Sequence, residues 1–323
     1  MSKIIISSAI RCKNKQAFFA LHQMQSKVHA LDPTVDVEFH VLWDTDTAVT
    51  EKRDDPTWGA LIDTHIKNLH SYDRQFFKDY VTRCYGDKYV NELDKHFAIY
   101  LVLMGHYLRR VKMYDYYVNY DDDVVIHDDF SHVFGLMQKH IPVLITEPMN
   151  MACDKAMFSK LYELYGNDFV ENYKQRNPRT MGCNGGFQGI DLAIYDQFLS
   201  ADRFDLLLSM FELKSNIRED GTEIWGNERF LIDTQQQSFS SLMNIVLSRN
   251  TPHLLDDAEY FVIPTFGVHP VFGEIKSDDG FDGYGFALKS KITHFIGHTE
   301  GRGKPKVFLD IVDKYLLDRG FDI

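Results

Sequence analysis

Residues 116–126 read Tyr116-Tyr117-Val118-Asn119-Tyr120-Asp121-Asp122-Asp123-Val124-Val125-Ile126, so three consecutive aspartates separate two apolar runs. The tyrosine-rich and β-branched flanks predict a buried strand that ends at the aspartates. Because side chains alternate between faces in an extended segment, we expect Asp121 and Asp123 to point one way and Asp122 the other. Two carboxylates that converge at the end of a buried strand repel each other and lose hydration, so they call for a cation.

This pair of aspartates is typical of a site for a hard divalent cation. Mg²⁺ and Mn²⁺ usually bind through one or two carboxylates and the phosphates of a substrate. The segment therefore predicts a metal site whose other ligand is a nucleoside diphosphate. The alternative is a solvated acidic turn that caps the strand, and the apolar flanks make that alternative weaker.

Composition indicates a globular protein and excludes several functional classes. The chain has 323 residues, 44% of them hydrophobic and 25% charged, which is enough for a large core in one domain or two joined halves. Its formal net charge is −12 and it has no block of lysine and arginine, whereas binding to a nucleic-acid backbone requires a basic face. Nucleic acid is therefore not an expected partner.

The cysteine spacing and the lengths of the apolar runs indicate where in the cell the protein is located. The four cysteines include no C-x-x-C pair, so we expect free thiols rather than a zinc site or a disulfide framework. No apolar run has the length of a membrane span, and the N-terminal residues do not have the pattern of a signal peptide. We therefore expect no transmembrane segment and a cytoplasmic location.

The first half of the chain alternates predicted strands and helices. We expect strands at 3–9 and 37–43, a helix at 16–29, and a helix at 94–111 that leads into the aspartate strand. This order predicts an α/β fold with a parallel sheet covered by helices, in which ligands bind beyond the carboxyl ends of the strands. Residues 48–86 have no clean periodicity, and we interpret them as an insertion or a helical flap.

The second half of the chain has fewer predicted helices and strands and contains a glycine-rich segment. A strand is expected at 141–146 and a helical stretch at 192–199, while 223–233 is typical of a loop that enters a helix. Between them, residues 181–190 contain four glycines, which permit positive φ angles and close approach of a ligand to the backbone. The alternative for this glycine-rich segment is a tight turn with a bulge at the start of a strand.

In this order, the D-x-D segment, the glycine-rich segment, the acidic loop, His294-Phe295-Ile296-Gly297 and Lys304-Pro305 resemble a known family. They are similar to nucleotide-sugar glycosyltransferases of the glycosyltransferase-A fold, in particular the glycogenin-like and lipooligosaccharide galactosyltransferase group. The resemblance implies a mixed sheet flanked by helices in a single catalytic domain. It also implies a nucleotide-sugar-binding half at 1–130 and an acceptor-binding half with the C-terminal metal and diphosphate segment at 131–323.

By the same resemblance, Mn²⁺ or Mg²⁺ is held by Asp121, Asp123 and His294, and Lys304 contacts the diphosphate of the donor. Six residues separate Gly297 from Lys304, more than is usual in the family. His298 is therefore the alternative to His294 as the metal ligand, and Arg302 is the alternative to Lys304 at the diphosphate. A histidine beside two carboxylates favours Mn²⁺ over Mg²⁺.

We expect the donor, most simply a UDP-hexose, to be bound near the end of the first strand and around the aspartates. Arg11 follows that strand, and Lys95 begins the helix that precedes the aspartate strand. For both residues the alternative is a solvated surface charge. The donor-binding residues we predict are Ala9, Arg11, Lys95, Asp121, Asp122 and Lys304.

The acidic loop contains the catalytic candidates. Trp225-Gly226-Asn227-Glu228 resembles the acidic motif of both inverting and retaining galactosyltransferases, and we favour Glu228 over Asp233 as the catalytic carboxylate. The alternative role for Glu228 is an acid that stabilises a helix N-terminus. Because H-F-x-G is the more specific match, we expect retention of configuration. The predicted contacts to the sugar or to a glycan or glycoconjugate acceptor are Asn184, Gly185, Gly186, Trp225 and Asn227.

Two other functions fit parts of the same pattern. A metal-dependent nucleotidyltransferase or phosphohydrolase would use the aspartates alone, and it would release pyrophosphate or phosphate rather than UDP. A carbohydrate-binding protein on the same fold would bind UDP and Mn²⁺ without transfer.

Overall fold

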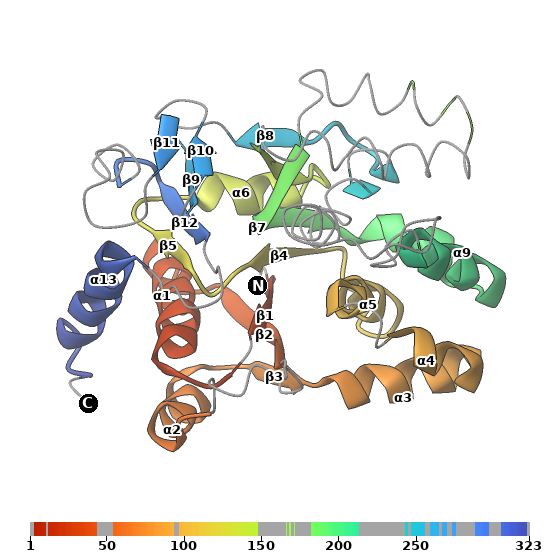
Figure 1. Cartoon of the computed structure of the whole chain (residues 1–323), viewed down its shortest axis with the longest axis horizontal. Coiled ribbons are helices and arrows are strands. Elements are labelled where there is room, and N and C mark those ends of the chain that lie inside the picture. The colour runs from red at the N-terminus through yellow and green to blue at the C-terminus, as the bar shows by residue number, and fades with distance from the viewer. Residues whose placement is uncertain are drawn as a thin grey trace. The chain divides into compact units, whose positions relative to one another are not determined.

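The structure is a computed structural model (Figure 1). It describes residues 3–10, 12–43, 54–93, 97–147, 166, 168, 171, 182–212, 243–244, 247–255, 259–264, 267–269, 273–275, 288–296 and 305–321.

The chain forms two compact units, each assembled from separate segments. The first unit comprises Met1–Ser71, Tyr120–Phe134 and Leu255–Ile323, and the second comprises Tyr72–Asn119 and Gly135–Leu254. The aspartates therefore lie in the same unit as the C-terminal segment that carries His294. The functional division into 1–130 and 131–323 stays a prediction.

In the first unit, β1 (Lys3–Ile10) pairs in parallel with β2 (Asp36–Trp43), and β3 (Leu69–Tyr72) lies on the other side of β2. Helix α1 (Lys15–Leu31) makes the parallel crossover, and α2 (Pro56–His65) packs against it. Asn14 starts α1, since its side-chain oxygen accepts a hydrogen bond from the Ala17 amide at 2.9 Å.

A smaller sheet completes the first unit. Its strands are β5 (Val124–Ile126), β12 (Ile292–Ile296) and β9 (Tyr260–Pro264), in that order, with β12 antiparallel to β5 and parallel to β9. Helix α13 (Lys306–Leu317) packs against α1 through Phe308 and Tyr315, whose rings meet Phe19 edge to face. A separate antiparallel pair is formed by β10 (Gly267–His269) and β11 (Gly273–Ile275).

In the second unit the strand order is β4-β7-β6-β8, with β6 antiparallel to β7. The strands are β4 (Tyr116–Tyr120), β6 (Val143–Glu147), β7 (Gly182–Asp191) and β8 (His253–Leu255). The helices are α3 (Arg74–Tyr85), η1 (Asp87–Tyr89), α4 (Val90–Leu93), α5 (Phe97–Arg110), η3 (Leu192–Phe198) and α9 (Ala201–Glu212). Helix α6 (Ser131–Met137) includes the boundary between the two units at Phe134 and Gly135.

Parallel and antiparallel pairs together confirm the predicted α/β architecture of a mixed sheet flanked by helices. The expected strands at 3–9, 37–43 and 141–146 correspond to β1, β2 and β6, and the helix at 16–29 is α1. The helical character expected for part of 48–86 is confirmed by α2 and α3, but the stretch is not an insertion or a flap, because β3 within it pairs with β2 in the main sheet. The four-residue β3 is too short to show a period, and only its last residue is buried.

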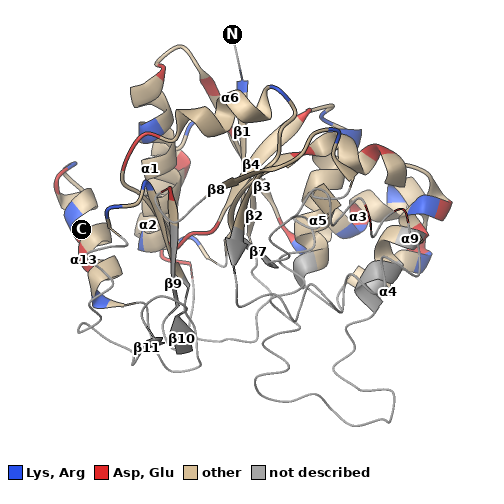
Figure 2. Ribbon diagram, turned by 90° about the horizontal axis from the view of Figure 1, so that it is seen from above, with Lys and Arg blue, Asp and Glu red and all other residues tan. Residues whose placement is uncertain are grey.

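Charged residues lie mainly on the helices, and the strands carry few of them (Figure 2). Acidic and basic residues alternate there, as in the Lys314–Asp318 pair at the end of α13. No helix among the described residues has the length and apolar character that crossing a membrane requires.

Gly105 lets α5 approach η3 closely. A Cβ atom added at Gly105 would lie 2.6 Å from the ring of Tyr195, whereas a Cβ at Gly135 in α6 would have no neighbour within 4 Å. Alanine in a helix is better than glycine by about 0.5–1 kcal/mol, but overpacking costs roughly 1–3 kcal/mol. We expect Gly105→Ala to lower the urea midpoint of unfolding and Gly135→Ala, its matched control, to leave it equal or higher. Equal shifts in both variants would contradict close packing at Gly105.

Candidate metal site

The aspartates lie in a turn rather than in an extended strand. Strand β4 ends at Tyr120, and the amide of Val124 donates to the carbonyl of Asp121 at 3.3 Å before β5 begins. The expectation of an extended segment at the aspartates is therefore wrong. A run of like charges is easier to hydrate in a turn than inside a ladder, and the chain uses the turn to pass from β4 to β5.

Pairing of β12 with β5 brings the histidine to the aspartates. His294 is in register with Val124, and the amide of Phe295 donates to the carbonyl of Asp123 at 3.0 Å. On one side of this ladder Phe295 is buried against Phe308 of α13. His294 is buried next to the turn, and its ring centroid lies 6.3 Å from that of Tyr260.

The side chains of Asp121, Asp123 and His294 converge as predicted. Their ligand atoms all lie within 4.8 Å of one another. Nε2 of His294 is 3.0 Å from Oδ1 of Asp123 and 3.6 Å from Oδ2 of Asp121. Adjacent ligands in an octahedral shell of about 2.1 Å radius lie roughly 3 Å apart, so a divalent cation fits this spacing with small adjustments.

The three predicted metal ligands differ in burial, so the site has one buried side and one side open to solvent. The side chains of His294 and Asp123 are only 5% and 10% exposed, whereas that of Asp121 is 37% exposed. Two ligands are thus fixed in the protein and the third borders solvent. Such an arrangement holds a cation firmly from one side and leaves its other side open to a phosphate-bearing ligand.

Gln23 of α1 supports this site, although it is not among the residues predicted from the sequence. Its side chain is buried and pairs with the backbone of β5 in both directions, donating from Nε2 to the Val124 carbonyl and accepting the Ile126 amide at Oε1. The amide therefore fixes the strand that follows the aspartate turn. A polar residue on a helix face that otherwise packs in the core was the available clue.

The end of β1 is tied to the same turn. Oγ of the buried Ser8 donates to the carbonyl of Tyr120 at 2.7 Å, so the carboxyl end of β1 lies next to the aspartates. Ala9, which we predict to contact the donor, is half-buried immediately after Ser8. Asp122 is also half-buried. Burial of Tyr120 raises the pKa of its hydroxyl well above the usual value, and the negative charge of Asp122 contributes to a lesser extent.

The glycine-rich segment forms most of β7 in the second unit. The Gly185 carbonyl accepts from Nδ2 of Asn119 at 3.2 Å and from Nε2 of Gln188 at 3.4 Å, and Gly186 is buried. Asn184 pairs with Ile145 of β6, and the register shifts between Val143 and Ile145. The glycines thus lie in a long strand with an irregular partner. Their contact with a sugar stays a prediction.

Several predicted residues lie outside the described part of the chain. They are Arg11, Lys95, Trp225, Asn227, Glu228, Asp233, Lys304 and the alternatives His298 and Arg302. The described residues therefore bring together the predicted metal ligands, and Ala9 follows Ser8, which is bonded to the residue before the aspartates. The roles of the residues outside the described part rest on the sequence.

Comparison with known proteins gives structural matches but no sequence match. No family model matches the chain, and no curated protein matches it. Among solved structures, the galactosyltransferase LgtC, in a complex with donor and acceptor sugar analogues, shares 13% identity at a TM-score of 0.43, with 96% of this chain and 95% of that one covered.

Two further matches have similar values. Mouse xyloside xylosyltransferase 1 shares 11% identity at a TM-score of 0.47, over 93% of this chain and 99% of that one. The glycosyltransferase GlyE of Streptococcus pneumoniae TIGR4 shares 10% identity at a TM-score of 0.42, over 99% of this chain and 64% of that one. At such values the function of this chain has to be argued from its own site.

Proposed function

We propose that this protein is a metal-dependent glycosyltransferase that moves a hexose from a nucleotide sugar, UDP-linked in the simplest case, to a glycan or glycoconjugate acceptor. The observation that carries the proposal is the convergence of Asp121, Asp123 and His294 at the end of β4. Two carboxylates and one imidazole, with one side open to solvent, suit a cation that also binds a diphosphate.

The residues of the first unit would act on the leaving group. When a sugar leaves a nucleoside diphosphate, negative charge grows on the diphosphate and positive charge grows on the anomeric carbon. Asp121, Asp123 and His294 would hold a divalent cation, which we expect to be Mn²⁺, and such a cation would supply charge to neutralise the diphosphate. Asp123 and His294 hold their positions through burial and the β5–β12 ladder, so little reorganisation is needed as that charge develops.

The remaining roles in this proposal come from the sequence. Lys304, or Arg302 in its place, would contact the diphosphate, and Arg11 and Lys95 would contact the nucleotide. Glu228 would serve the anomeric carbon, either as a base for the acceptor hydroxyl or from beneath the ring, with retention of configuration as the favoured outcome.

A donor panel tests the reaction class. UDP-, GDP- and CMP-sugars are incubated with the protein and Mn²⁺, and both the melting temperature and the released nucleotide are measured. We expect one UDP-sugar to raise the melting temperature and to release UDP slowly in the absence of acceptor. A nucleoside triphosphate incubated in parallel should yield neither pyrophosphate nor phosphate.

The other outcomes identify the competing functions. Release of pyrophosphate or phosphate would indicate a nucleotidyltransferase or phosphohydrolase that uses the same cation. Tight binding of UDP and Mn²⁺ without hydrolysis or transfer for any sugar and acceptor would indicate a binding protein on this fold.

A further inference from the structure

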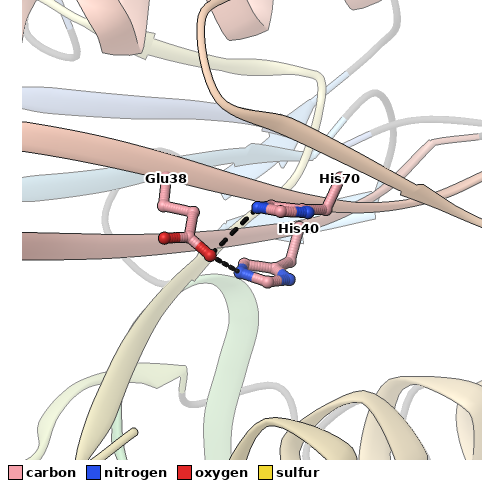
Figure 3. Close-up of side chains that lie close together, drawn as sticks. All are labelled: Glu38, His40 and His70. Atoms are coloured by element: carbon pink, nitrogen blue, oxygen red, sulfur yellow. Dashed lines mark hydrogen bonds and ion pairs between the residues drawn. The ribbon is translucent and has the colours of Figure 1, made fainter. Parts of the chain in front are cut away.

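A second group of potential metal ligands lies on β2 and β3 and has no part in the proposed reaction. Glu38 and His40 are two residues apart on β2, so both side chains emerge on the same face, and His70 reaches them from β3. The two rings stack with centroids 4.6 Å apart and planes 14° apart. Figure 3 shows both rings directing a nitrogen at the Glu38 carboxylate.

The three ligand atoms lie close to one another. Nε2 of His40 and Nε2 of His70 each lie 3.0 Å from the same oxygen of Glu38, Oε1, and all three atoms lie within 4.8 Å of one another. In a tetrahedral zinc site with bonds of about 2.0–2.1 Å, neighbouring ligand atoms lie roughly 3.3 Å apart. Because the two ring planes are only 14° apart, their nitrogen lone pairs run side by side, and an ion bound in the plane of both rings would require His70 to turn out of the stack.

The surroundings hold two of the ligands and leave the third able to adjust. The side chains of His40 and Glu38 are 0% and 8% exposed, whereas that of His70 is 38% exposed. Nζ of Lys3 donates to the other carboxylate oxygen, Oε2, at 2.5 Å, which orients Oε1 toward the imidazoles. Hydrogen bonds of this kind to a metal ligand fix its orientation. The exposed side of His70 would let an ion enter the site from solvent.

We propose that Glu38, His40 and His70 form a Zn²⁺ site that fastens β3 to β2. Two imidazoles with one carboxylate suit zinc better than Mg²⁺ or Ca²⁺, and a fourth position is left for water. Glu38 and His40 pair with Ile5 and Ser7 in the middle of β1, and the site shares no residue with the aspartate turn. We therefore expect the ion to strengthen the β2–β3 connection and sugar transfer not to depend on it.

Metal binding tests this site most directly when the aspartate turn is disabled. The full chain carrying Asp123→Asn is freed of metal with chelator and titrated with Co²⁺, a spectroscopic substitute for Zn²⁺. We expect one equivalent to bind with the visible absorption of a four-coordinate ion, and Zn²⁺ to displace it. At free Zn²⁺ about 100-fold above Kd, the melting temperature should rise by roughly 5 °C.

Variants localise the bound ion. His70→Ala in the same Asp123→Asn background should abolish both the Co²⁺ spectrum and the thermal shift. His29→Ala, which changes a half-exposed histidine of α1, should leave both unchanged. His70→Ala alone should keep Mn²⁺-dependent transfer within about twofold of the unaltered chain, so this proposal can fail independently of the proposed function.

Two results would overturn the zinc site. One is an Asp123→Asn protein that shows no four-coordinate Co²⁺ spectrum at any Co²⁺ concentration. This result alone would contradict the site, without data from a further variant. The other is a His70→Ala protein that binds Co²⁺ with the same stoichiometry and spectrum. Either result would mean that the two histidines and Glu38 form only a hydrogen-bonded group.

Discussion

Asp123→Asn is expected to abolish sugar transfer and to weaken Mn²⁺ binding by at least about 100-fold, with the fold intact. Loss of even an outer partner of a metal ligand costs about 10–100-fold in affinity, and Asp123 is itself a predicted ligand whose side chain is 10% exposed. Asparagine has the same size but carries no charge to neutralise the ion. Titration of Mn²⁺ by electron paramagnetic resonance and a transfer assay measure the two effects.

Two further variants distinguish loss of a metal ligand from loss of a nearby negative charge. Asp128→Asn, in an exposed position just after β5, should change neither measurement. Asp121→Asn should weaken Mn²⁺ binding less than Asp123→Asn, because Asp121 is more exposed and lies farther from His294. Chelation with EDTA should stop transfer, and Mn²⁺ should restore it better than Mg²⁺. Full turnover in the presence of chelator would contradict the metal-dependent mechanism.

The histidine ligand can be assigned by the same titration. His294→Ala should weaken Mn²⁺ binding more than His298→Ala, because Nε2 of His294 lies 3.0 Å from the Asp123 carboxylate. The opposite order would transfer the role to His298.

Glu228→Gln is expected to lower kcat by about 10³-fold while leaving the Kd values for UDP-sugar and Mn²⁺ nearly unchanged. A positioned general base or nucleophilic carboxylate acts mainly in the transition state, and such groups contribute roughly 10²–10⁴-fold to the rate. The prediction rests on the Trp225-Gly226-Asn227-Glu228 motif, in which the tryptophan can face a sugar ring. Steady-state kinetics and calorimetric donor binding separate the two quantities.

Asp233→Asn is the comparison variant, since the two acids lie close together in the chain. It should retain most of the activity. An active Glu228→Gln protein alongside an inactive Asp233→Asn protein would assign the role to Asp233. An NMR spectrum of the fresh product reports the anomeric configuration, and inversion would contradict the retaining mechanism.

The sequence predicted the elements whose signals are local. Helix α1 and strands β1, β2 and β6 follow from apolar spacing within short windows. The strand signal before the aspartates was also local, and β4 ends at Tyr120 as expected. By contrast, β3 was missed because it is short and only its last residue is buried. The turn at 121–124 was considered only as the weaker alternative, because three charged residues have no period that distinguishes a turn from a strand.

By itself, the sequence determined which residues could bind a cation, because Asp121, Asp123 and His294 have side chains suited to one. Only the tertiary structure decided that they meet, since the antiparallel pairing of β12 with β5 places His294 beside a turn that lies far from it in the chain. The same holds for Gln23 against β5 and for His70 against Glu38 and His40. Long-range strand pairing depends on the packing of whole elements, and no local pattern encodes it.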